Sequence, residues 1–282
     1  MVENKKEGIN GARETVSLSV HNLSFAYRHD KPVIENINFS LFGGELLFLL
    51  GKNGAGKSSL FRCVLGFESR YSGEIFINGE SSKNISAQKM AKQMAFVPQI
   101  HYPSFNYSAF DMVLMGTAAQ GSEWSTPNTS QIQNAISAME QIGISHLSDR
   151  DFNLISGGEQ QLVLIARSIA QLIKAPSATS HKAPILVMDE PTANLDYGNQ
   201  LRVLFKIKEL SRDGFSILLS THNPDHAFLF ADRIIALHDK NIVAFGKPSD
   251  CLSESLIERL YGVKVNVQAD KNGMRTCIPE IN

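Results

Sequence analysis

The stretch Gly51-Lys52-Asn53-Gly54-Ala55-Gly56-Lys57-Ser58 decides the fold of this chain. It fits the phosphate-binding pattern G-x-x-x-x-G-K-[ST]. The apolar run Glu45–Leu50 precedes it, and Lys57–Val64 after it is expected to be helical. A buried strand, a glycine-rich loop and a helix in this order direct backbone N–H groups and a helix N-terminus at one phosphate. A chance glycine-rich turn is the alternative, and the flanking strand and helix argue against it.

The polar residues of this loop have expected partners on a bound nucleotide. Lys57 is predicted to reach the β- and γ-phosphates, and the Ser58 hydroxyl is predicted to bind Mg²⁺. Ser59 is placed on the α-phosphate side. The other nucleotide-binding positions that we assign to the loop are Gly51, Asn53, Gly54, Ala55 and Gly56.

A pair of carboxylates, Asp189 and Glu190, follows the apolar run Ile185–Met188. At the carboxyl edge of a sheet, Asp189 can meet the shell of a bound Mg²⁺. Glu190 is suited to polarise an attacking water. The alternative is an acidic pair that only caps a helix.

The segment Ser156-Gly157-Gly158-Glu159 has the spacing of a capping box, and its two glycines allow close backbone approach. The next residues, Gln160–Ile173, are apolar nearly all round, which predicts a buried and fixed helix. A fixed helix N-terminus with free amides is an anion site. An ordinary capped helix is the alternative. A second phosphate site beside one nucleotide loop is explained if Ser156–Glu159 serves the ATP of a neighbouring chain.

The order of the remaining segments indicates an α/β fold. Alternating patterns predict an antiparallel layer, whereas continuous apolar runs predict parallel strands buried on both faces. Tyr197–Ser211 is the expected crossover helix between two parallel strands, which places helices on both sides of the sheet. The antiparallel segments are Ser17–Leu23, Val33–Leu41 and Gly73–Gly79, with a turn at His29–Pro32, and the parallel ones are Glu45–Leu50, Ile185–Met188 and Ser216–Leu219.

A mostly helical subdomain is expected at about 101–159, inserted into a core of about 15–100 and 160–265. Ser130 with Gln133 resembles a capping box, and Gly143 is the expected end of that helix. The two strands around Asp239-Lys240 predict a terminal hairpin. We expect residues 1–14 to be a disordered leader, 175–184 a surface loop, 15–265 one ATPase domain and 266–282 a tail.

The composition and charge of the chain restrict its possible partners and its cellular compartment. The formal net charge is -1, so a broad nucleic-acid footprint is not indicated. Cys63, Cys251 and Cys277 lie far apart without metal spacing, as free thiols do in a reducing compartment. No apolar stretch reaches the roughly 20 residues that span a bilayer. These features favour a cytosolic chain whose membrane role depends on another subunit.

Together these motifs resemble the nucleotide-binding subunit of an ABC transporter over about Ser17–Val263. The resemblance implies a P-loop NTPase ABC cassette with an antiparallel β layer and an inserted helical subdomain. It assigns Walker A to Gly51–Ser58, Walker B to Ile185–Asp189, and the catalytic carboxylate to Glu190. Further matches are the signature motif Ile155–Gln160, the Q-loop Gln99, the D-loop Ala193–Asp196, the switch His222 and the adenine-stacking Tyr27.

The resemblance also implies a mechanism. Two copies would form a head-to-tail homodimer in which each ATP lies between one Walker A loop and the partner's signature motif. Gln99 would help to hold Mg²⁺, and His222 would contact the γ-phosphate. The closing and opening of this dimer would be transmitted to a separate membrane permease at the cytoplasmic face. Ile155 departs from the usual leucine, and this swap keeps volume and apolarity.

A finer resemblance is to the ATPases of importers for iron–siderophore complexes, haem and cobalamin. Phe105–Gly116, Leu195–Gln200 and His222–Ala227 carry it. Such importers also use an extracytoplasmic substrate-binding protein. An ATPase of a molybdate importer is a close alternative interpretation. An export-type or soluble non-transport ABC ATPase is a more distant alternative. Phe105–Met115 is either core or a permease contact, and its place after Gln99 favours the contact.

Overall fold

The computed structural model describes residues 15–28, 31–99, 103, 105–120, 126–173, 182–271 and 273–280. The expected leader 1–14 lies outside these residues, as do positions 29–30 of the predicted turn and 175–181 of the predicted loop. Of the predicted turn the structure describes residues 31–32, and of the predicted loop residues 182–184. Within the described residues, no helix is both long and apolar enough to cross a bilayer.

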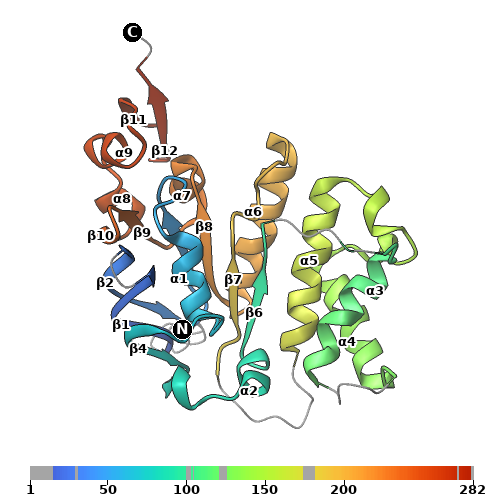
Figure 1. Ribbon diagram of the computed structural model, residues 1–282. Coiled ribbons are helices and arrows are strands. Elements are labelled where there is room, and N and C mark those ends of the chain that lie inside the picture. Colours follow the sequence, from blue (N-terminus) through green and yellow to red (C-terminus); the bar gives the residue numbers. More distant parts are fainter. Residues whose placement is uncertain are drawn as a thin grey trace, which may run out of the picture.

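A six-stranded sheet forms the centre of the molecule (Figure 1). Its strand order is β10-β9-β3-β8-β7-β6; the strands from β9 to β6 are parallel and β10 is antiparallel. All residues of β3, β7 and β8 are buried, which confirms the prediction from their apolar runs. The strands are β3 Leu46–Leu50, β6 Met94–Val97, β7 Ile185–Met188, β8 Ser216–Thr221, β9 Arg233–His238 and β10 Asn241–Gly246.

A second sheet provides the predicted antiparallel layer, in the order β2-β1-β4-β5. Leu47 and Leu49 of β3 face this layer, whereas Leu46, Phe48 and Leu50 face the helical side, as the alternation of a strand requires. Lys31 and Pro32 belong to β2 and not to the predicted turn. The strands are β1 Val16–Arg28, β2 Lys31–Phe42, β4 Tyr71–Ile77 and β5 Glu80–Ser81.

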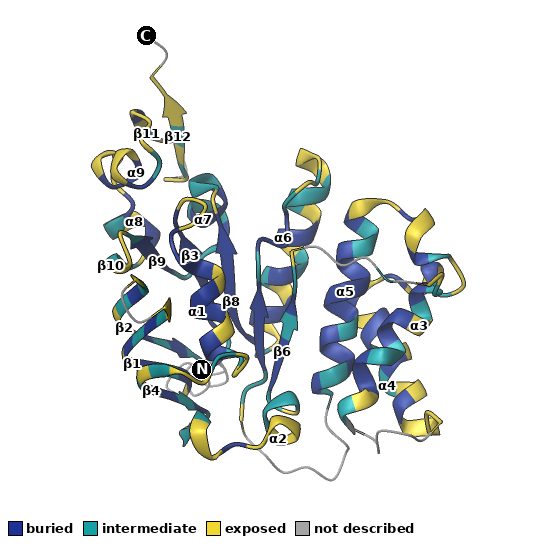
Figure 2. Ribbon diagram, viewed as in Figure 1, coloured by how far each residue is buried: buried dark blue, intermediate teal, exposed yellow. Residues whose placement is uncertain are grey.

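The helices at one side of the large sheet form the expected helical region (Figure 1). Its longest member, α5, packs on α3 and α4 and also on β6, so it joins this region to the sheet. Figure 2 shows that α5 is largely buried, which confirms its nearly continuous apolar pattern. The elements of this region are α3 Ala109–Leu114, α4 Thr129–Ile142 and α5 Gly157–Leu172, with 3₁₀ turns at Met115–Gln120, Ser145–Leu147 and Phe152–Leu154. Helix α2 Ala87–Ala91 and the 3₁₀ turn Ser82–Asn84 precede β6 and lie outside it.

The predicted start of α4 is wrong by two residues. The capping box consists of Asn128 and Gln131, not of Ser130 and Gln133. Both pairs have the required spacing, but the Gln131 side chain also donates to the buried Thr117 carbonyl at 3.1 Å. This tertiary bond selects the earlier start. Gly143 ends the helix in the left-handed conformation, as expected.

The hairpin of β9 and β10 turns at Asp239-Lys240, which both have positive φ. The hairpin itself is confirmed, but it is not terminal. The chain continues through two helices and a further hairpin, none of which was predicted from the sequence. The remaining helices and strands are α1 Lys57–Val64, α6 Tyr197–Arg212, α7 Pro224–Phe230, α8 Pro248–Cys251, α9 Glu254–Tyr261, β11 Val265–Ala269 and β12 Arg275–Pro279.

An ion pair with a buried carboxylate holds the two large sheets together. The Arg233 guanidinium, at the start of β9, donates to both oxygens of Glu45 and to the Ser40 carbonyl of β2. Its charge lies between the rings of Phe42 and Phe245, 4.8 and 4.6 Å from their centroids. The Glu45 carboxylate is 7% exposed and also accepts the Phe42 amide.

Replacement of one partner should therefore destabilise the protein strongly. Arg233→Met leaves the Glu45 charge buried without its cation, and we expect a loss of about 3 kcal/mol in the free energy of unfolding. The double variant Glu45→Gln/Arg233→Met removes that charge and should recover more than half of the loss. Urea unfolding measures both. A double variant as unstable as the single one would contradict this account.

Candidate active site

Four parallel strands that are neighbours in the sheet end at one edge, and each delivers part of the predicted site. β3 leads into the loop 51–56, β7 into Asp189 and Glu190, β8 into His222, and β6 into Gln99. Polar groups at the carboxyl ends of adjacent parallel strands are thus brought together, as is usual in α/β folds.

The loop after β3 has the backbone of a phosphate cradle. Gly56 precedes α1 with φ of 104°, and a Cβ there would lie 2.7 Å from Ile34 Cγ2. Only glycine fits this position. Lys57 is 6% exposed, and its Nζ donates to the Gly51 carbonyl at 2.8 Å. The ammonium is therefore held in the mouth of the loop, at the N-terminus of α1.

Asp189 and Ser58 form the candidate Mg²⁺ position. Ser58 Oγ donates to Asp189 Oδ2 at 2.9 Å. Ser220 Oγ donates to Asp189 Oδ1 at 2.6 Å and accepts from the Glu190 amide at 2.9 Å. Ser220 was not singled out from the sequence; its signal is a polar residue near the end of the apolar strand β8. A hydroxyl and a carboxylate at this spacing are oxygen ligands of the kind that Mg²⁺ prefers.

Glu190 is the residue on which the other predicted groups converge. Its carboxylate lies 3.1 Å from Lys57 Nζ, accepts from Gln99 Nε2 at 3.4 Å, and lies 3.3 Å from His222 Nδ1. Its backbone has φ of 44°, which is uncommon for a residue with a side chain. Strain of this kind concentrates at functional sites, where the surroundings impose it.

Lys57, Gln99 and Glu190 line a pocket of about 400 Å³, whereas His222 is not among the described residues that line it. Its size and its amide, ammonium and hydroxyl lining fit a phosphate chain. Val33 also lines it and was not predicted. Tyr27 lies at the rim, 53% exposed, with its hydroxyl 3.2 Å from Ser59 Oγ. The described residues that line the pocket are Val33, Asn53, Gly54, Gly56, Lys57, Ser58, Ser59, Gln99, Asp189 and Glu190.

The segment Ser156–Glu159 is not brought to this pocket among the described residues. It forms the predicted capping box: Ser156 Oγ accepts from the Glu159 amide at 3.3 Å and donates to Glu159 Oε2 at 2.7 Å. The Ser156 hydroxyl, followed by its backbone amide, lowers the pKa of Glu159. The Ser156 amide in turn donates to Glu159 Oε2 at 2.9 Å. Ser156 and Gly157 are exposed at the N-terminus of α5.

Gly158 packs against the residues that follow Glu190. A Cβ at this position would lie 2.6 Å from Asn199 Oδ1, and one at Gly157 would lie 3.3 Å from Leu195 Cδ2. Asn199 is fixed by Asp196, which accepts both its amide and its side-chain Nδ2. The turn before α5 and the turn before α6 therefore touch directly.

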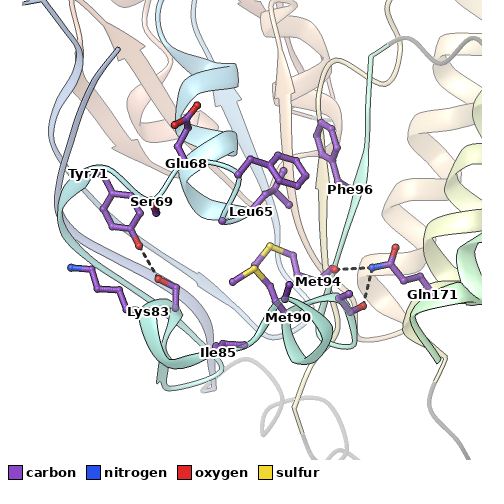
Figure 3. Close-up of a pocket in the computed structure, with 15 residues that line it drawn as sticks. Leu65, Glu68, Ser69, Tyr71, Lys83, Ile85, Met90, Met94, Phe96 and Gln171 are labelled. Atoms are coloured by element: carbon purple, nitrogen blue, oxygen red, sulfur yellow. Dashed lines mark hydrogen bonds between the residues drawn. The ribbon is translucent and has the colours of Figure 1, made fainter. Parts of the chain in front are cut away.

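A second cavity, of about 490 Å³, lies between the end of α1, β4, α2 and β6 (Figure 3). Its walls are largely apolar, and they include Met90, Met94 and Phe96. Phe67 is 60% exposed at the cavity and meets the Phe96 ring edge-on at 6.3 Å between centroids. Phe96 lies on β6, three residues before Gln99. One short strand thus connects this cavity to the nucleotide pocket.

Comparison with known proteins agrees with the geometry. Residues 34–193 match the family model described as ABC transporter. The hemin import ATP-binding protein HmuV of Bordetella pertussis is 34% identical over 90% of this chain and 95% of its own length. The molybdate import ATP-binding protein MolC of Haemophilus influenzae is 31% identical over 87% and 88%.

Among solved structures, an inward-facing metal-chelate type ABC transporter superposes with a TM-score of 0.80 and 29% identity. The match covers 94% of this chain and 98% of that chain. The fold is therefore that of an ABC cassette, as predicted. The chain belongs to the ABC transporter family as an ATP-binding protein that hydrolyses ATP.

Proposed function

We propose that this chain is the ATPase subunit of an importer that takes up a metal chelate through a separate membrane permease. The convergence of Lys57, Gln99 and His222 on Glu190 carries the assignment of hydrolysis. The relatives that import hemin, and the metal-chelate type of the structural neighbour, favour an iron–siderophore, haem or cobalamin complex as cargo. Because another relative is named for molybdate import, molybdate is the alternative cargo.

In the proposed reaction, the loop amides and Lys57 hold the β- and γ-phosphates, and Tyr27 stacks on adenine. Mg²⁺, held by Ser58 and Asp189 with help from Gln99, would neutralise charge on the phosphates. On ATP binding, Lys57 exchanges its contact with Glu190 for the phosphates. The Glu190 carboxylate is then free to orient and deprotonate the attacking water, while His222 contacts the γ-phosphate.

We propose further that two copies act as a head-to-tail homodimer. Ser156 and Gly157 are exposed, and Ser156–Glu159 does not reach its own pocket among the described residues, so this segment is available to a second chain. ATP favours the closed dimer because the two chains can contact the same γ-phosphate only when the dimer is closed. Hydrolysis removes these contacts, and the dimer opens.

The cavity of Figure 3 is the proposed docking surface for the permease. It is apolar, it carries the exposed Phe67, and β6 joins it to Gln99. The segment Phe105–Met115, with Phe105 69% exposed, extends the contact along the helical region of about 101–159. In this arrangement the domain of about 15–265 lies at the cytoplasmic face of the membrane. A substrate-binding protein acts on the opposite side.

Glu190→Gln should bind ATP but hydrolyse it at least about 100-fold more slowly, because the amide cannot accept a proton from water. Phosphate release and equilibrium nucleotide binding measure the two effects. Glu209→Gln on α6, an exposed site, is the matched control and should behave as wild type. Near-normal hydrolysis by Glu190→Gln would overturn the role of Glu190.

Ser156→Arg, combined with Glu190→Gln, should prevent the ATP-dependent dimer but leave ATP bound to the monomer. The large side chain occupies the place of the partner's γ-phosphate, while loss of the cap weakens α5 by only about 1 kcal/mol. Light scattering with and without ATP reports the mass. Ser145→Arg, exposed on the same helical region, is the control. A Ser156→Arg dimer of wild-type stability would refute the head-to-tail arrangement.

Phe67→Glu should reduce recovery of the permease about tenfold when the tagged ATPase is purified from native membranes in mild detergent. The basal ATPase rate should not change, since Phe67 does not line the nucleotide pocket. Phe205→Glu on α6 replaces a similarly exposed aromatic residue and serves as control. Mass spectrometry identifies the copurifying proteins. Ribosomal or DNA-bound partners without a permease would support a non-transport ATPase instead.

A further inference from the structure

The C-terminal hairpin of β11 and β12 is fixed to the body of the protein at several points. Val267 of β11 donates its amide to Glu254 Oε1 of α9 at 2.8 Å, and Arg275 of β12 donates to the Ser249 carbonyl. Val265 is buried in the main core. Figure 1 shows β12 alongside α7, and the two elements pack together. The hairpin is therefore an ordered part of the structure next to α7.

The direct bond between β12 and α7 lies close to the active site. The Cys277 amide of β12 donates to Asp225 Oδ1 at 2.7 Å. Burial raises the pKa of the Cys277 thiol to about 12, and the Asp225 carboxylate adds to this effect. The thiol thus stays protonated beside the carboxylate. Asp225 lies three residues after His222, in the first turn of α7.

The backbone around His222 is held from both ends. On one side, Thr221 Oγ1 accepts the Asn223 amide at 3.1 Å. On the other, Asn223 Oδ1 caps the Asp225 amide at 2.9 Å. The His222 side chain is 59% exposed, and in this structure its contact with Glu190 is a long one of 3.3 Å. The position of the imidazole consequently depends on the backbone segment Thr221–Asp225.

A second contact joins the C-terminal region to the nucleotide loop. The hydroxyl of Tyr261, the last residue of α9, is buried without a hydrogen bond of good geometry. Burial raises its pKa, and the nearby Gly51 amide acts in the opposite direction. Gly51 is the residue whose carbonyl holds Lys57. The C-terminal region therefore contacts both the nucleotide loop, near Gly51, and the segment after β8, at Asp225.

We propose that Asp225 is a positioning residue, which links the C-terminal hairpin to hydrolysis by fixing the segment that carries His222. The inference rests on the proposed role of His222. A side chain that accepts the Cys277 amide holds α7 against β12, so that the imidazole stays within reach of the γ-phosphate. Loss of this bond lets the segment shift, and displacement of a catalytic group by about 1 Å can slow a reaction about 100-fold.

The test compares Asp225→Ala with Asp225→Asn, because the asparagine oxygen can still accept the Cys277 amide. We expect Asp225→Ala to lower kcat for ATP about 10- to 100-fold, with ATP affinity unchanged within about twofold. Asp225→Asn should restore kcat to within about threefold of wild type. Asp250→Ala, which removes an exposed carboxylate from α8, is the control.

The outcomes separate this inference from the proposed function. Wild-type kcat in Asp225→Ala, with turnover lost in His222→Ala, would overturn only the positioning role. Full turnover in His222→Ala would overturn the proposed role of His222 itself. Equal losses of kcat and thermal stability in Asp225→Ala and Asp225→Asn would assign the effect to the charge at the start of α7, and not to the bond with the hairpin.

Discussion

The shared edge of four parallel strands is the constraint on which the rest of this structure depends. β3, β8, β7 and β6 are consecutive in the sheet, so the residues after them lie side by side along one edge, within reach of one another's side chains. The continuous apolar sequences of β3, β7 and β8 bury these strands on both faces of the sheet, which keeps this edge in place. The contacts of Glu190 with Lys57, Gln99 and His222 follow from this arrangement, although these residues are far apart in the sequence.

Much of this edge could be predicted from the sequence. The apolar runs define β3, β7 and β8, and the glycine pattern before Lys57 defines the loop. Ser220 and Val33 were missed because the signal of a polar residue near a strand end is weak, and a valine in a strand has no distinctive pattern. Their importance comes from tertiary contacts: Ser220 bonds to Asp189, and Val33 forms a wall of the pocket.

The errors also have physical causes. The start of α4 was misplaced because two capping pairs have equal spacing, and only the bond from Gln131 to Thr117 distinguishes them. The hairpin of β11 and β12 escaped detection because its strands are short and more than half of their residues are exposed. Such a segment gains its stability from anchors such as Glu254 and Asp225, which are distant in the chain. The local hydrophobic periodicity of the segment does not reveal these contacts.

The contact between Gly158 and Asn199 has an evolutionary consequence. Because a β-carbon at position 158 would lie 2.6 Å from the Asn199 oxygen, neither residue can be replaced freely without regard to the other. A lineage that acquired alanine at 158 would need a smaller residue at 199, and would then lose the bonds that Asn199 makes with Asp196. The two positions should therefore vary together among relatives, as a signature of this packing.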